Sequence, residues 1–175
     1  MMDISIIKSD QVTTEGGIVI GHPEAPVTFV EFLNLACPYC RKWFLKSEEQ
    51  LTKAVEAGQV RRIIKPYNKD KDDLLIGNLA HTYLPFDQPA IALNAIHFLY
   101  THQKTWRPDL SDSEFDKYMQ ANLKLSPLDN TVQLAAIVDE AQAANIKFVP
   151  TIIAGEHIFD ESITSEELDT ILQAK

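Results

Sequence analysis

The stretch VTFVEFLNLACPYCRKW, residues 27–43, carries the pattern that decides the fold. Its first nine residues form a nearly unbroken apolar run, rich in β-branched and aromatic side chains, directly after Pro26. Such a run is typical of a strand that is buried on both faces of a sheet. From Cys37 onward, apolar side chains recur at helical spacing as far as Val55, and Gly58 predicts the end of that helix.

A second short strand is predicted at residues 60–66, so strand, helix and strand follow one another in a single run. This order describes a βαβ unit, whose crossover is expected to be right-handed. Residues 68–146 then predict helices only, which together make a helical insertion. Ser111 and Glu114 form a capping box before one of these helices, and Pro127 predicts the first turn of the last.

Strands return near the C-terminus. Residues 151–153 and 157–159 flank the turn residues Ala154-Gly155-Glu156, which predicts a β-hairpin. Thr164 and Glu167 form a capping box that predicts a final helix. The chain therefore predicts an α/β fold, in which helices separate the first two strands from the last two.

Composition and charge exclude several classes of protein. The 16 basic and 25 acidic side chains give a net charge of −9, which speaks against a nucleic-acid-binding or anionic-membrane surface. The longest apolar stretch, residues 90–100, is about half as long as a membrane span requires. Residues 1–5 lack the basic start of a secretory signal, so we expect a cytoplasmic protein, or an extracytoplasmic one if the chain is a trimmed mature form.

The two cysteines, Cys37 and Cys40, lie where the buried strand passes into the helix. Pro38 between them suits a first helical turn, because it lacks only a donor that would be unsatisfied there. Residues three apart in a helix have Cβ atoms about 5–6 Å apart, so a disulfide needs only a small local change. The helix N-terminus, with Arg41 and Lys42 nearby, favours the thiolate of Cys37, which is the reactive form.

Two other readings compete with a redox pair. Cys37 and Cys40 could be half of a zinc site, but no second cysteine pair exists, and His97 and His102 are too far apart in sequence to share a helical face well. They could also be inert core cysteines. The strand context and the proline favour the redox reading, with no metal and no cofactor. His81 has no convincing partner at motif spacing.

Residues 27–43, together with the lead-in GHPEAPV at residues 21–27, resemble the DsbA-like branch of the thioredoxin superfamily. The other landmarks follow in the same order: a helical insertion, a Val-Pro-Thr loop at residues 149–151, a hairpin and a C-terminal helix. The resemblance implies a thioredoxin-like fold, a central mixed sheet flanked by helices, with an all-helical subdomain inserted at residues 68–146. It implies one domain over residues 1–175.

The resemblance also implies roles at the site. Cys37 would be the exposed nucleophile, Cys40 the buried resolving thiol, and Pro150 a cis-proline that faces them. A cis bond would leave the backbone of Val149 free to pair with an extended substrate, so Val149, Pro150 and Thr151 are candidate substrate-binding residues.

The dipeptide between the cysteines bears on the direction of the reaction. Tyr39 stands where the strongest periplasmic oxidants of this family carry a histidine, and Pro38-Tyr39 is the dipeptide of glutaredoxins and of some isomerase-type relatives. A reducing cytosol also keeps such pairs as dithiols. We therefore expect a reduction potential in the reducing or intermediate range.

Glu31 is the one charged residue of its strand, and strand alternation puts it on the same face as Phe29 and Leu33. The DsbA-like family carries a buried glutamate six residues before the first cysteine, and Lys65 matches a family lysine near that carboxylate. We therefore predict that Glu31 lies buried behind Cys40, with Lys65 beside it, and relays the proton that Cys40 must lose.

The sequence thus predicts a thiol–disulfide oxidoreductase that exchanges disulfides with protein substrates through Cys37-Pro38-Tyr39-Cys40. Its expected partners are protein dithiols and disulfides, with glutathione or a thioredoxin-type reductant as the redox partner, and neither nucleic acid nor a membrane. Two alternatives stay open. One is a glutathione-linked reductase or transferase of the same fold, and the other is a redox-sensing binding module that does not turn over.

Overall fold

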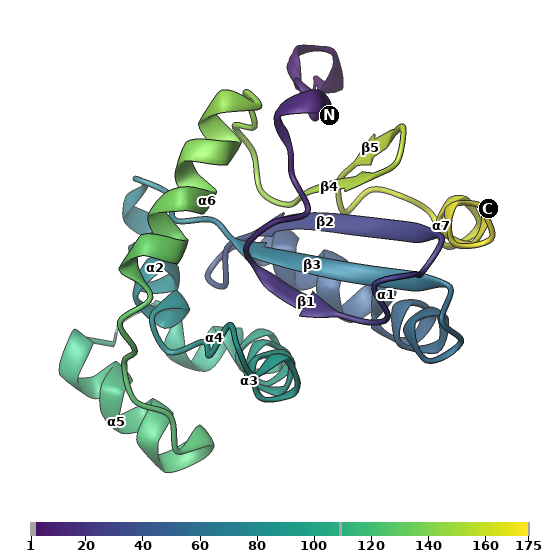
Figure 1. The fold of residues 1–175 in the computed structure, drawn as a ribbon. Coiled ribbons are helices and arrows are strands. Elements are labelled where there is room, and N and C mark those ends of the chain that lie inside the picture. The colour runs from purple at the N-terminus through teal and green to yellow at the C-terminus, as the bar shows by residue number, and fades with distance from the viewer. Residues whose placement is uncertain (1–2, 109, 175) are drawn as a thin grey trace.

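A computed structural model describes residues 3–108 and 110–174. Five strands form one sheet in the order β1-β3-β2-β4-β5 (Figure 1). The strands are β1 (Ile18–Ile20), β2 (Val27–Leu33), β3 (Val60–Pro66), β4 (Thr151–Ala154) and β5 (His157–Phe159). β2 and β3 pair in parallel and the other neighbours pair antiparallel, so the mixed sheet is confirmed. β1 was not predicted, because three apolar residues are too short to show a period.

Seven α-helices are described. They are α1 (Pro38–Glu56), α2 (Leu75–His81), α3 (Pro89–Thr101), α4 (Gln103–Trp106), α5 (Asp112–Leu123), α6 (Thr131–Ala143) and α7 (Ser165–Leu172). Short 3-10 turns lie at Ile4–Ile6, Ser9–Gln11 and Asp72–Leu74. Helices α2 to α6 separate β3 from β4, and Figure 1 shows them gathered at the end of the sheet where β2 and β3 finish.

Both predicted capping boxes are present, at Ser111 and at Thr164. The prediction that the last helix of the insertion starts at Pro127 is wrong, since α6 begins at Thr131. The backbone N–H of Leu128 donates to the Thr82 carbonyl, and the Asn130 amide donates to the carbonyls of His81, at the end of α2, and of Leu84, just after it. These bonds hold the segment before α6 against α2, so it does not start a helix.

The sheet separates two buried clusters. On one face Phe29 and Ile64 join the core that includes Trp43 and Phe44 of α1. On the other face Phe32 joins a smaller cluster with side chains of α6. Because β2 and β3 are parallel with Phe29 opposite Arg62, each face carries alternate residues of both strands.

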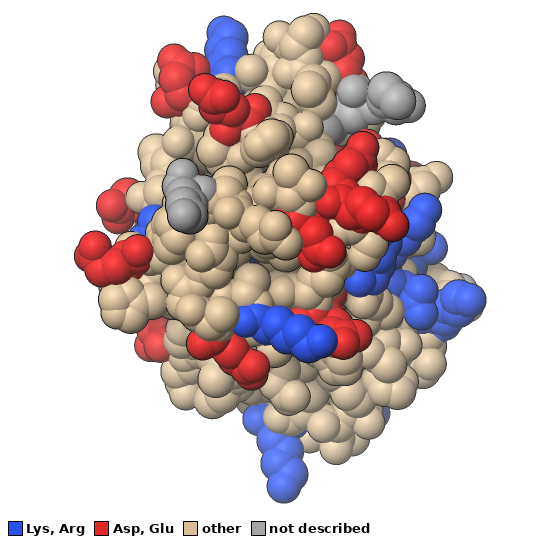
Figure 2. All heavy atoms as spheres, turned by 90° about the vertical axis from the view of Figure 1, so that its right-hand side faces the viewer, with Lys and Arg blue, Asp and Glu red and all other residues tan. Residues whose placement is uncertain are grey.

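The surface is mixed in charge. On the face that Figure 2 shows, acidic and basic side chains are interspersed among uncharged ones. Within residues 3–108 and 110–174, none of the helices combines the length and the apolar character that crossing a membrane would require.

Candidate active site

Cys37 and Cys40 lie at the start of α1. Cys37 is the residue that precedes the first turn, and Pro38 occupies the first helical position. Both thiols are free. Pro38 and Tyr39 are exposed, Tyr39 by 61%, whereas Cys37 is only 5% exposed and Cys40 is fully buried. Cys37 was expected to be exposed, but it is almost fully buried. A loop before β4 lies against its sulfur.

That covering loop ends in Val149-Pro150, and the peptide bond between these residues is cis, as the resemblance implies. The Cys37 Sγ atom lies 3.6 Å from the backbone oxygen of Val149. The antiparallel pairing of β2 with β4, in which Phe32 faces Thr151, brings the end of one strand to the start of the other. The sheet itself thus joins two motifs that are 112 residues apart.

The two thiols differ in acidity. The hydrogen bond from the Cys40 thiol, helped by the backbone N–H groups of Cys40 and Tyr39, lowers the pKa of Cys37 to about 7, although burial opposes this. Burial raises the pKa of Cys40 well above its usual value, and its contact with Cys37 adds to the rise. Arg41 turns its guanidinium toward the backbone oxygen of Tyr100, so the first helical turn rather than this cation accounts for the acidity of Cys37.

The loop between β2 and α1 binds the sulfur of Cys40. The backbone N–H of Asn34 donates to the Cys40 sulfur at 3.4 Å. The Asn34 side chain accepts from the N–H of Ala36 at 2.9 Å and donates to the oxygen atoms of Tyr67 and Asn78, each at 3.1 Å. Sequence reasoning missed Asn34, although an amide inside an apolar run, three residues before the first cysteine, was a usable signal.

His81, the last residue of α2, binds the same loop. Its Nε2 atom accepts from the backbone N–H of Leu35 at 3.2 Å, and its Nδ1 atom lies 2.7 Å from the Asn68 side-chain oxygen. The ring is fully buried, and burial lowers its pKa to about 3. The partners of His81 do not lie at motif spacing: they come from the loop before α1 and from the loop after β3, which the sequence pattern could not connect to it.

Glu31 is fully buried, as predicted. Its carboxylate accepts two hydrogen bonds from the Arg62 guanidinium, at 2.7 and 2.9 Å, and one from the Trp43 indole at 2.9 Å. Arg62 is itself 2% exposed and lies over the Phe44 ring, 5.3 Å from its centre. The cation beside Glu31 is therefore Arg62.

The prediction that Lys65 lies beside Glu31 is wrong. Lys65 is three residues after Arg62, so strand alternation turns it to the opposite face of the sheet. There its Nζ atom lies 2.5 Å from the Glu140 carboxylate of α6 and 2.8 Å from the Thr13 carbonyl. Lys65 stabilises the packing of α6 and takes no part in the cysteine site.

The histidines weighed for a zinc site lie elsewhere. His97 binds the Glu48 carboxylate at 2.6 Å, and the ring of His102 lies against that of Phe98. Among the residues described, no three His, Cys, Asp or Glu side chains gather as metal ligands would.

Residues 13–174 match the model of the family described as Thioredoxin. A conserved protein of unknown function from Enterococcus faecalis V583 is 46% identical, with a TM-score of 0.95 over 99% of this chain and 98% of that one. The catalytic domain of Proteus mirabilis ScsC is 20% identical, with a TM-score of 0.70 over 94% and 92% of the two chains.

The thiol–disulfide exchange protein alpha-DsbA2 from Wolbachia pipientis is 15% identical, with a TM-score of 0.70 over 97% of this chain and 91% of that one. No curated protein matches the chain. At such low identity the ScsC and alpha-DsbA2 structures show a shared fold, and the family match extends over most of the chain. The chain therefore belongs to the thioredoxin family, in agreement with its resemblance to the DsbA-like branch.

Proposed function

We propose that the chain is a thiol–disulfide oxidoreductase that acts on protein substrates, with Cys37 as nucleophile and Cys40 as resolving thiol. The observation that carries this proposal is the pair of free thiols at the start of α1, one with a pKa lowered to about 7 and the other with a raised pKa. Thiolates rather than thiols attack disulfides, so this difference supports Cys37 as the thiol that attacks first. The exchange chemistry of alpha-DsbA2, which shares the fold, supports the assignment.

In the reducing direction, the Cys37 thiolate attacks one sulfur of a substrate disulfide. A Cys37–substrate disulfide forms, and the other substrate sulfur leaves as a thiolate that takes up a proton. Cys40 then loses its proton and attacks the Cys37 sulfur, which releases the second substrate thiolate. The substrate gains two electrons, the Cys37–Cys40 disulfide holds the oxidised state, and the oxidising direction reverses each step.

The substrate would lie across the Cys37 sulfur against the Val149 loop. The Val149 carbonyl lies beside that sulfur, so a backbone N–H of an extended substrate segment could bind near it. The two segments that meet at this sulfur each carry an exposed aromatic side chain, Tyr39 in α1 and Phe148 in the loop, 61% and 58% exposed. This surface favours an apolar, extended protein segment as substrate.

A reducing or intermediate potential fits the acidity of Cys37. A nucleophile with a pKa of about 7 lies in the range of thioredoxin, whereas the strong oxidant DsbA has a value of about 3.5. We therefore propose a potential nearer to about −270 mV than to about −120 mV.

Equilibration of the protein with mixtures of reduced and oxidised glutathione, followed by thiol alkylation, measures this potential. Turnover of a protein disulfide such as that of insulin, with dithiothreitol as electron donor, tests the function directly. We expect turnover that is lost in Cys37→Ser. Turnover with glutathione mixed disulfides alone would favour the glutathione-linked alternative, and oxidation without turnover would favour a redox sensor.

A further inference from the structure

The loop that leads into Cys37 is bound by side chains of the insertion at four consecutive carbonyl groups. The Tyr100 hydroxyl donates to the Asn34 oxygen at 3.2 Å, the Gln103 amide to the oxygens of Leu35 at 2.8 Å and Cys37 at 3.1 Å, and the Arg107 Nε–H to the Ala36 oxygen at 2.5 Å. We name these donors, Tyr100, Gln103 and Arg107, the carbonyl clamp. They come from the end of α3, from α4 and from the residue after α4.

Gln103 lies at the centre of the clamp. It is 3% exposed, and its side-chain nitrogen binds the carbonyls on both sides of Ala36. Burying an amide group costs free energy unless the group is hydrogen-bonded. The two hydrogen bonds to Leu35 and Cys37 therefore hold the Gln103 side chain in one orientation. The Cys37 carbonyl also accepts the first helical bond, from the N–H of Arg41 at 3.1 Å. Gln103 thus acts on the peptide group that starts α1.

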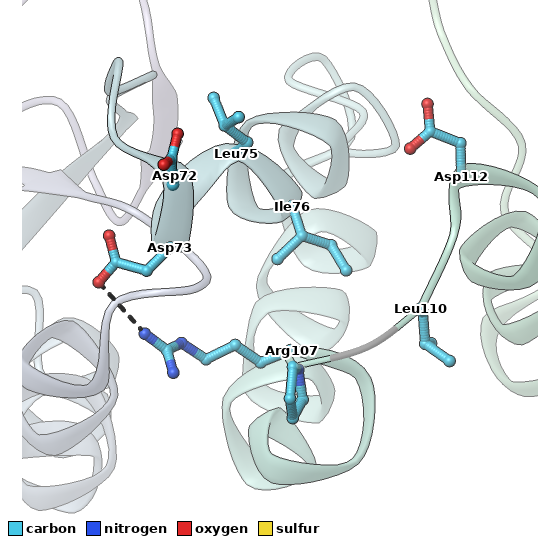
Figure 3. Close-up of a pocket in the computed structure, with 8 residues that line it drawn as sticks. Asp72, Asp73, Leu75, Ile76, Arg107, Leu110 and Asp112 are labelled. Atoms are coloured by element: carbon cyan, nitrogen blue, oxygen red, sulfur yellow. Dashed lines mark ion pairs between the residues drawn. The ribbon is translucent and has the colours of Figure 1, made fainter.

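The other two donors of the clamp, Tyr100 and Arg107, are each held in place by their surroundings. Burial raises the pKa of Tyr100 well above its usual value, so its hydroxyl keeps its proton and donates. Figure 3 shows the Arg107 side chain extended toward Asp73, whose carboxylate lies 3.6 Å from the guanidinium. Arg107 and Asp73 border a hollow of about 380 Å³ that also includes Leu75, Ile76 and Leu110. Arg107 therefore reaches residues 34–37, which we call the redox loop, from the surface of the insertion.

We propose that Tyr100, Gln103 and Arg107 are positioning residues, and that the insertion uses them to set the reactivity of Cys37. The inference rests on the proposed thiol–disulfide exchange. None of the three side chains needs to touch the substrate. Gln103 and Arg107 act through backbone carbonyls of the redox loop, and the Tyr100 hydroxyl lies close to the Cys40 thiol as well as to a loop carbonyl.

The physical reason is the direction in which the chain enters α1. The pKa of Cys37 is lowered first by the hydrogen bond from the Cys40 thiol and then by the backbone N–H groups of Cys40 and Tyr39. All of these donors belong to the first turn of α1, and burial and the carboxylate of Glu161 oppose them. Donors on the loop carbonyls keep those oxygens, which carry partial negative charge, pointed at the insertion. Without the clamp the loop can rotate, the N–H groups lose their alignment, and the thiolate of Cys37 is less stabilised.

Gln103→Leu tests this in the full-length protein, with Gln133→Leu, an exposed glutamine of α6, as matched control. We expect the pKa of Cys37, measured by thiolate absorbance, to rise by about half a unit to one unit. The rate of reaction with oxidised glutathione at pH 6 should fall roughly two- to fourfold, because less of Cys37 is ionised at that pH. The fall is smaller than the loss of thiolate alone, since the more basic thiolate is also more nucleophilic. The control should change neither quantity. An unchanged pKa in a folded Gln103→Leu protein would overturn the proposal.

Arg107 gives a second test if Gln103→Leu fails to fold, because its side chain is 28% exposed. Arg107→Leu should raise the pKa of Cys37, and Arg107→Lys, which keeps a donor, should restore most of the original value. Lys104→Leu removes an exposed cation from the same corner and should have no effect. Equal pKa values in all three variants would contradict the clamp. Failure of the wild-type protein to exchange disulfides would instead contradict the proposed function, since the thiol titration does not depend on turnover.

Discussion

The Sγ atom of Cys37 lies 3.6 Å from the backbone oxygen of Val149, although the two residues are 112 positions apart. The carbonyl is close enough to accept a hydrogen bond from the thiol, and it borders the surface where we place the substrate. When Cys37 loses its proton, that bond is lost and the Val149 oxygen becomes available to another donor. A substrate backbone N–H is such a donor, so ionisation of the nucleophile and binding of the substrate favour each other.

The acidity of Cys37 is the first prediction. Its pKa should lie near 7, because hydrogen bonds of the first helical turn stabilise the thiolate, while burial keeps Cys40 protonated. Absorbance at 240 nm and alkylation by iodoacetamide, both followed from pH 5 to 10, measure it. Cys37→Ser is the control and should show no titration near 7. A wild-type midpoint at the free-thiol value of about 8.5 would contradict the assignment.

The order of attack gives the second prediction. Cys40→Ser should accumulate mixed disulfides between Cys37 and its substrates, because the resolving thiol is missing. Cys37→Ser should not, since Cys40 is fully buried and its pKa is raised. Mass spectrometry after mixing with oxidised glutathione, and then with a disulfide-bonded protein, detects the adducts. Similar yields from both variants would rule out the proposed roles.

The sequence predicts the parts of this protein that depend on local patterns. The apolar run of β2, the helix after Cys37 and the two capping boxes follow from residue type and spacing. The placement of Glu31 in the core likewise follows from strand alternation. The cis bond before Pro150 came from a family resemblance rather than from the local pattern.

Contacts between distant segments could not be predicted in this way. Lys65 was expected beside Glu31, but the parallel register puts Arg62 on that face and Lys65 on the other. Gln103 carries no motif, and only the folded insertion brings it to the carbonyl of Cys37. Arg62 and Lys65 are three positions apart in β3, so their side chains point to opposite faces of the sheet. Each cation therefore pairs with a different carboxylate, Arg62 with Glu31 and Lys65 with Glu140.

His81 gives a third prediction, on the pH dependence of stability. The folded protein keeps this ring neutral down to about pH 3, whereas the unfolded chain protonates it near its ordinary value of 6.5. The unfolded state therefore binds the extra proton between these values. As the pH falls through this window, His81 alone should lower the free energy of unfolding by about 1.4 kcal/mol per pH unit.

Urea unfolding of the wild type and of His81→Gln at pH 6, 5 and 4 isolates this effect. The variant can still accept from the Leu35 N–H but does not titrate, so its stability should fall less steeply with pH. His157→Gln, at an exposed position of β5, is the matched control and should keep the wild-type slope. Parallel curves for the wild type and His81→Gln would show that the buried ring is not responsible.

Gly77 gives a fourth prediction. A Cβ atom at this position of α2 would lie 2.0 Å from the Asn34 side-chain oxygen and 2.8 Å from the Ala36 nitrogen. Alanine in a helix is ordinarily more stable than glycine by about 1 kcal/mol. Here Gly77→Ala should instead destabilise the protein by about 1–3 kcal/mol and raise the pKa of Cys37, because it pushes the redox loop away.

Gly155→Ala is the control for Gly77→Ala. Its φ of +61° is unfavourable for alanine, but nothing lies within 4 Å of the added atom. We expect lower stability with the reactivity of Cys37 unchanged. If Gly77→Ala is as stable as the wild type, the close approach of α2 to the loop is not required.

The last prediction separates the two roles of Glu31, as partner of a buried cation and as proton acceptor for Cys40. Three hydrogen bonds from Arg62 and Trp43 occupy its carboxylate, which offers about four acceptor sites, so about one site stays open for a proton. Glu31→Gln leaves the Arg62 charge buried without an anion. It should therefore lower the free energy of unfolding by about 3–5 kcal/mol.

The double variant Glu31→Gln/Arg62→Met removes both charges and should recover most of that stability, because the lone buried cation is gone. If Glu31 accepts the proton of Cys40, the double variant should still resolve a preformed Cys37 mixed disulfide at least about tenfold more slowly than the wild type. The initial attack by Cys37 should keep its rate. Lys65→Met, which breaks the ion pair on the opposite face, should leave both steps unchanged. Wild-type resolution in the double variant would mean that Glu31 only compensates Arg62, and that Cys40 passes its proton to another group.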